Sequence, residues 1–142
     1  MAECNGWAGT ILDVNLTTGE IIKKAVPRDL VVDYVGGTGL AAKILYDELK
    51  PGVDPLGPDN IVMVTHGTLS GTLAPSCGRF DVITKAPLTG IFLRTNGGGF
   101  FGPELKWAGY ELIIIRGQSK TPVYLWIKDD HVELRDASHL WG

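Results

Sequence analysis

The sequence predicts a single α+β domain, in which a strand-rich, antiparallel or mixed β-sheet forms the base and carries a few short helices. Segments of strand length recur along the chain, some alternating and some wholly apolar, and turn residues separate them. Only a few stretches show a helical spacing of apolar residues. With 142 residues and an apolar share of 44%, the chain can bury one compact core.

The N-terminal half is expected to contain a hairpin, two helices and a buried strand. The hairpin follows from apolar residues on both sides of the turn at Thr17-Thr18-Gly19. The second helix is the clearest element, because Leu40, Ile44 and Leu45 share one face. Pro51 follows that helix and ends it. The expected elements are strands over 10–16 and 20–26, helices over 28–35 and 40–49, and a strand over 61–64.

The C-terminal half is expected to contain more strands and two loops of small residues. The loops cover 67–78 and 96–102, and Pro103 suits the first turn of a short helix that follows the second loop. The expected strands cover 79–84, 90–95 and 111–116, and a last hairpin joins 122–128 to 132–135.

Charge and cysteine content exclude several classes of function. The net charge of −3 argues against a nucleic-acid partner, because neutralising phosphates needs a basic surface. No apolar run approaches the roughly 20 residues of a membrane span, and the N-terminus lacks the features of a signal peptide, so a cytoplasmic protein is expected. Two cysteines, Cys4 and Cys77, are too few to ligate an iron–sulfur cluster.

Packing is the expected role of several other residues that can carry chemistry. His66 lies next to a buried strand and is expected to be a satisfied core histidine, whereas His131 is expected in a solvated turn. The three histidines show no metal-binding spacing. Core packing is also expected of each tryptophan, namely Trp7, Trp107, Trp126 and Trp141.

The segment 37–42 fits the G-x-G-x-x-A pattern of dinucleotide-binding loops. That pattern binds a dinucleotide when a strand precedes it, but residues 29–35 space their apolar groups like a helix. We therefore favour a turn between two helices, and keep a nucleotide-binding domain as an alternative.

The glycine loop at 96–102 is the strongest candidate for a binding site. Glycine makes up 19 of the 142 residues, nearly twice the usual share of about 7%. Gly97, Gly98 and Gly99 leave successive backbone N–H groups free to surround an anion, and phosphate is a natural ligand of such a loop. A tight loop without a ligand fits the same residues equally well.

Arg79 is a second candidate, because it follows small residues at the start of an expected strand. An arginine in that position can bind a phosphate through two N–H groups. A surface ion pair is the alternative, and for an isolated arginine it is the favoured one.

Taken together and in order, the motifs resemble the N-terminal domain of the aldehyde:ferredoxin oxidoreductase family. The likeness extends from Trp7 to Gly142. The segments that carry it are Val14–Gly19, Gly36–Ala41, Asp54–Leu56, Gly78–Phe80, Thr84–Gly90, Asn96–Tyr110 and Arg135–Gly142.

This resemblance implies a tungsten or molybdenum enzyme that binds its metal through two pterin cofactors. Such enzymes oxidise aldehydes to carboxylic acids and pass the electrons to ferredoxin, while relatives reduce aromatic acyl thioesters. The N-terminal domain is the sheet on which the pterins lie. Later domains supply a four-iron four-sulfur cluster and the substrate channel, and a homo-oligomer is expected.

The resemblance also assigns roles to the candidate residues. Arg79 corresponds to an arginine that contacts the pterin phosphates. Asn96 corresponds to an asparagine whose backbone carbonyl reaches the Mg²⁺ that bridges the two phosphates. Gly98 corresponds to a glycine whose backbone contacts the cofactor, and Gly97 and Gly99 complete the loop. No catalytic residue is expected in this chain.

Two departures limit what the resemblance implies. Thr38 stands where many relatives carry a basic residue. The second phosphate-binding loop is expected beyond Gly142, so residues 1–142 are expected to form a pterin-binding domain truncated at its C-terminal end and inactive by itself. A stand-alone subunit of a related complex, or a non-catalytic binding or assembly module, is the alternative.

Overall fold

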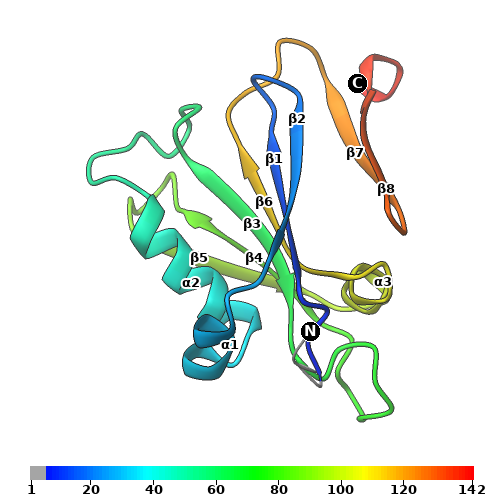
Figure 1. Ribbon diagram of the computed structural model, residues 1–142. Coiled ribbons are helices and arrows are strands. Elements are labelled where there is room, and N and C mark those ends of the chain that lie inside the picture. The colour runs from blue at the N-terminus through cyan, green and yellow to red at the C-terminus, as the bar shows by residue number, and fades with distance from the viewer. Residues whose placement is uncertain (1–5) are drawn as a thin grey trace.

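The computed structural model describes residues 6–142, in which six strands form one sheet and two more form a separate hairpin (Figure 1). Cys4 lies outside the described residues. The elements are β1 (Thr10–Asn15), β2 (Glu20–Ala25), α1 (Arg28–Tyr34), α2 (Gly37–Glu48), β3 (Ile61–His66), β4 (Phe80–Lys85), β5 (Phe92–Gly97), α3 (Phe101–Trp107), β6 (Tyr110–Arg116), β7 (Val123–Lys128), β8 (His131–Asp136) and a short 3-10 helix (Ser138–Leu140).

The large sheet has the strand order β2-β1-β6-β3-β4-β5. Strands β1 and β6 are parallel, and every other pair in the sheet is antiparallel. The mixed α+β architecture predicted from the sequence is therefore confirmed. Strand β5 is an edge strand, so half of its backbone groups face outward without a partner strand.

Each face of the sheet has its own apolar core. Helix α2 covers one face, where Leu40 and Ile44 pack against Met63, Ile83 and Leu112 (Figure 1). Helix α3 and the β7–β8 hairpin lie on the opposite face. The core there contains Leu12, Val14, Leu105, Tyr110 and Ile113, with the inner side chains of the hairpin packed around it.

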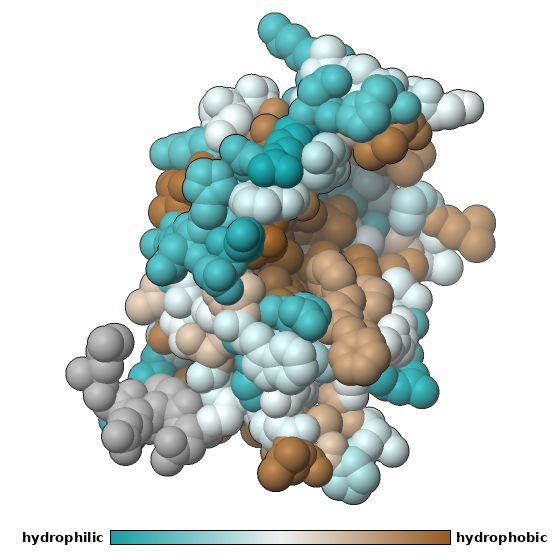
Figure 2. Space-filling model, turned by 90° about the vertical axis from the view of Figure 1, so that its right-hand side faces the viewer, coloured by the Kyte–Doolittle hydropathy of each residue, from teal (hydrophilic) through white to brown (hydrophobic). Residues whose placement is uncertain are grey.

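The face that carries α3 is only partly covered. A groove between α3 and β7 is lined by apolar side chains, among them Leu105, Leu125 and Ile127, and Figure 2 shows brown, apolar surface in the hollow of this face. Two tryptophans expected in the core are instead on the surface, since Trp107 is 58% and Trp141 is 79% exposed. The core expectation is wrong for these two residues.

Most predicted elements are present, with small shifts at their ends. Helix α2 begins at Gly37 rather than at Leu40, and α3 begins at Phe101 rather than at Pro103. Strand β5 continues to Gly97, which shortens the glycine loop. Within residues 6–142, no helix combines the length and the apolar character that a membrane crossing requires.

Candidate functional site

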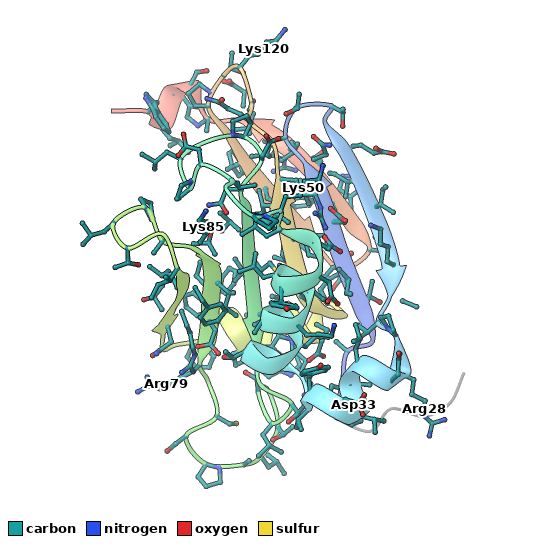
Figure 3. All side chains as sticks on the ribbon, turned by 90° about the vertical axis from the view of Figure 1, so that its left-hand side faces the viewer. Arg28, Asp33, Lys50, Arg79, Lys85 and Lys120 are labelled. Carbon is teal, nitrogen blue, oxygen red and sulfur yellow. The ribbon has the colours of Figure 1, made fainter. Side chains whose placement is uncertain are left out.

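Strand pairing brings Arg79 to the glycine loop. Phe80 pairs with Gly97 in the β4–β5 register, so the residue before β4 lies beside the end of β5. The guanidinium Nη1 of Arg79 donates a hydrogen bond to Asn96 Oδ1 at 2.5 Å. Both side chains are exposed, and Figure 3 shows Arg79 at the edge of the sheet, at the opposite end of the molecule from Lys120.

Two glycines of the loop are required by the packing and conformation of the chain. A Cβ added at Gly97 would lie 2.7 Å from the Phe80 ring, which itself packs against Phe101 with ring centroids 4.8 Å apart. Gly99 has φ +103°, a left-handed conformation that side chains other than that of glycine rarely adopt. A larger residue at either position would force the loop or its neighbours to move.

Gly98 is different, because neither of these constraints applies to it. Its φ lies outside the left-handed region, and a Cβ built on it would have no atom of the chain within 4 Å. Gly98 is exposed between two constrained glycines. Its backbone is therefore open to close approach from outside the chain.

Arg79 carries a positive charge that no described carboxylate neutralises. The ion pairs of residues 6–142 involve Arg94, Arg116 and Arg135, but not Arg79. The surface ion pair that was favoured for Arg79 as an isolated arginine is thus not formed with any described residue. An exposed guanidinium of this kind, next to open backbone, is suited to an anion with several oxygen atoms.

The segment 37–42 does not have the context of a dinucleotide site. It forms the first turns of α2, and the element before it is the helix α1. A Cβ added at Gly39 would lie 2.5 Å from the backbone oxygen of Tyr34, so this glycine allows α1 and α2 to pack closely. The predicted turn between two helices is confirmed, and the strand that a nucleotide-binding loop needs is absent from this position.

The histidines considered as candidates lie where packing or solvent explains them. His66 is fully buried, with Nε2 2.9 Å from the Tyr110 oxygen and Nδ1 3.1 Å from the Gly67 oxygen, which confirms a satisfied core histidine. His131 is exposed next to the β7–β8 turn, as predicted. Across residues 6–142, no three His, Cys, Asp or Glu side chains are grouped to hold a metal ion.

The structure also shows polar residues that the sequence did not single out. Asp81 is buried beside the candidate site and contacts Thr38 and Arg94. Glu111 is fully buried, and its Oε2 accepts a hydrogen bond from the Ala8 N–H at 2.9 Å. Asp81 on β4 and the preceding Arg79 are two residues apart, as Arg94 and Asn96 are on β5. This spacing can be read from the sequence, but only the register of β4 and β5 shows that Arg79 and Asp81 lie beside Arg94 and Asn96.

The structure is thus an α+β domain with open backbone at one edge of its sheet and, beside it, a guanidinium that has no carboxylate partner among residues 6–142. Comparison with known proteins identifies the family. Residues 11–142 match the family model described as aldehyde ferredoxin oxidoreductase, N-terminal domain. The chain belongs to this family of oxidoreductases.

Similar proteins include two tungsten-containing enzymes and one solved enzyme complex. The chain is 52% identical over 134 residues to the tungsten-containing aldehyde ferredoxin oxidoreductase of Thermococcus kodakarensis, which covers 94% of this chain and 22% of the relative. It is 48% identical to the enzyme of that name from Pyrococcus furiosus, with the same coverage. A structure of the active site complex BamBC of benzoyl coenzyme A reductase, with 1,5 dienoyl-CoA, matches with a TM-score of 0.94 and 45% identity over 96% of this chain and 21% of that chain.

The chain therefore spans about a fifth of the length of the proteins that it matches. The likeness covers the described sheet and helices almost completely. It does not extend to the other four fifths of those proteins, so the activity of a whole enzyme is a matter for proposal.

Proposed function

We propose that this chain binds the phosphate ends of a tungsten or molybdenum bis-pterin cofactor, as the N-terminal part of an oxidoreductase that converts aldehydes to carboxylic acids. Ferredoxin is the proposed electron acceptor. The proposal gives the 142 residues a binding role and places the catalytic residues and the four-iron four-sulfur cluster in other domains of the same enzyme, in the cytoplasm.

The observation that carries the proposal is the pairing of Arg79 with Asn96 beside Gly98. The exposed guanidinium lacks a carboxylate partner among the described residues, and Gly98 leaves space that a side chain would fill. A phosphate ester needs both features, a positive charge that stays available and a backbone that it can approach. The residues present thus fit the phosphates of the proposed cofactor.

Each residue of the loop has a proposed task. Arg79 binds phosphate oxygens, and the backbone of Gly97, Gly98 and Gly99 lies against the cofactor. The backbone carbonyl of Asn96 is the proposed ligand of a Mg²⁺ ion between the two phosphates, since Mg²⁺ prefers oxygen ligands of this kind. When bound, the metal–pterin group supplies the oxidation–reduction chemistry, and the protein holds and orients it.

A second candidate function is the reduction of aromatic acyl thioesters. The observation in its favour is the match to the BamBC complex of benzoyl coenzyme A reductase, at 45% identity and a TM-score of 0.94. The same loop serves in either case, because both proposals require the cofactor to be held by its phosphates. Assaying the purified enzyme with an aldehyde and with a benzoyl thioester distinguishes the two.

Replacing Arg79 tests the proposal. In the complete enzyme, Arg79→Ala should lower the tungsten bound per chain about tenfold or more, because a charged hydrogen bond to phosphate is lost. Arg28→Ala is the matched control, since Arg28 is exposed on α1 and makes no ion pair with a described residue. Figure 3 shows the two arginines far apart. Equal tungsten content in both variants would reject the proposed role of Arg79.

A further inference from the structure

A second guanidinium lies close to the candidate site and is held in a polar cluster around Asp81. Oδ1 of Asp81 accepts hydrogen bonds from Arg94, with Nε at 3.0 Å and Nη2 at 2.9 Å. Oδ2 accepts a hydrogen bond from Thr38 Oγ1 at 2.6 Å. The carboxylate is only 8% exposed, and both of its oxygens are occupied by a strand and by the first turn of α2.

This cluster shares one face of the sheet with Arg79 and Asn96. Residues two apart in extended chain point to the same side, so Arg79, which directly precedes β4, is expected on the same face as Asp81. Asp81 also pairs directly with Asn96, the acceptor of the Arg79 hydrogen bond. The Asp81 carboxylate is therefore the negative charge best placed to capture the Arg79 guanidinium.

The structure keeps these two opposite charges apart. Asp81 forms its ion pair with Arg94 instead, and Arg79 forms none with any residue from 6 to 142. A buried carboxylate needs a partner, because a buried charge without one strongly destabilises the folded state. If Arg94 did not provide that partner, Arg79 would be available to replace it, because it forms no ion pair with a described residue and lies two residues before Asp81.

We infer that Arg94, together with Thr38, is a positioning residue that reserves Arg79 for a phosphate. By saturating Asp81, Arg94 leaves the Arg79 guanidinium directed at the loop of residues 96–99 and free of a competing carboxylate. This inference rests on the proposed function, since it assumes that Arg79 binds the cofactor phosphates. It assigns Arg94 an indirect role through the Asp81 carboxylate.

Arg94 could also contact a phosphate directly, because 47% of its side chain is exposed. Such a direct role makes a different prediction. If Arg94 contacted phosphate, its loss would weaken binding whatever residue stood at position 81. If Arg94 only occupies Asp81, removing the carboxylate as well should make Arg94 dispensable.

The test compares the tungsten content of the complete enzyme with single and double substitutions. Arg94→Met should reduce tungsten per chain by about tenfold, as expected when Arg79 loses its charged hydrogen bond to phosphate. The double variant Arg94→Met with Asp81→Asn should recover most of the tungsten, because no carboxylate remains to capture Arg79. Arg94→Lys, which keeps a positive charge near Asp81, should stay near the wild-type value. Thermal unfolding of every variant verifies that it is folded.

The outcomes separate this inference from the proposed function. Normal tungsten in Arg79→Ala would remove both. Loss in Arg79→Ala with normal tungsten in Arg94→Met would remove the inference alone. Failure of the double variant to recover, in a protein that unfolds at the wild-type temperature, would show that Arg94 acts by itself and would also overturn the inference.

Discussion

The centre of the sheet and its β5 edge differ in composition, because the centre is buried and apolar whereas the edge is exposed. Strands β1, β6 and β3 lie next to one another and bury their apolar side chains on both faces, with Leu12 and Leu112 fully buried. Strand β5 exposes most of its residues and ends at Gly97, the first of three successive glycines. The centre gains its stability from burial, whereas the edge leaves a charge and a stretch of backbone open.

This difference shows how a glycine run can be interpreted residue by residue. Gly97 and Gly99 are required by the fold itself, one by the Phe80 ring and the other by its backbone conformation. Gly98 is required by neither. The proposed cofactor would supply a physical reason for the missing side chain at Gly98, because a ligand that approaches the backbone closely needs that space.

The largest effect on stability is expected in the centre of the sheet. Leu112→Ala should lower the free energy of unfolding by about 2–5 kcal/mol, because it leaves a cavity beneath α2. Leu88→Ala is the control, since Leu88 is 96% exposed, and it should change stability by no more than about 0.5 kcal/mol. Chemical denaturation measures both. Similar values for the two variants would contradict the described core.

A smaller, pH-dependent effect is expected at Asp13 on β1. Burial acts to raise the pKa of the Asp13 carboxyl, but hydrogen bonds from Arg116 and Lys24 and their positive charges outweigh burial and lower the pKa below its usual value. The folded protein therefore binds this proton more weakly than the unfolded chain does. The resulting stability is complete above the ordinary pKa of about 3.9 and is lost as the pH falls through the folded value.

Asp13→Asn should accordingly destabilise the protein at neutral pH by about 1–3 kcal/mol, discounted because Lys24 and Arg116 are partly exposed. The difference from the wild type should shrink as the pH falls below the ordinary pKa of the carboxyl toward the lowered pKa of the folded protein. Denaturation curves measured across this range provide the test. A constant difference between the two proteins would show that the Asp13 ion pairs do not contribute as described.

Two neighbouring glycines of the loop are expected to respond differently to the same substitution. Gly97→Ala should cost about 1–3 kcal/mol, because the Phe80 ring must move away from its place against Phe101. Gly98→Ala should change stability by no more than about 0.5 kcal/mol. We nevertheless expect Gly98→Ala to lower the tungsten content of the complete enzyme. Normal metal content in this variant would show that no ligand approaches Gly98.

Sequence patterns predicted the secondary-structure elements better than the pairing and contacts between them. Alternation and apolar runs located every strand, because burial on one face or both leaves a local signature. The parallel pairing of β1 with β6 was not predicted, since it joins segments about a hundred residues apart and no local pattern encodes such a register. For the same reason the sequence did not reveal that Asp81 contacts Arg94 and Thr38.

The candidate site was predicted from local composition and from family resemblance. The resemblance assigned Arg79 and the glycine loop to the same cofactor, and the β4–β5 register and the Arg79–Asn96 hydrogen bond bring the two together in the structure. Their roles toward a cofactor stay predictions. The exposure of Trp107 and Trp141 could not be predicted, because a side chain rich in apolar atoms does not itself reveal whether other elements cover it.

The most direct measurement is amide hydrogen exchange in the complete enzyme, with and without its metal–pterin cofactor. We predict that the amides of Gly98 and Gly99 exchange more slowly in the loaded enzyme, because the phosphates cover them, and that the amides of α1 exchange at the same rate in both forms. Equal exchange of Gly98 and Gly99 in the two forms would contradict the claim that this loop holds the cofactor.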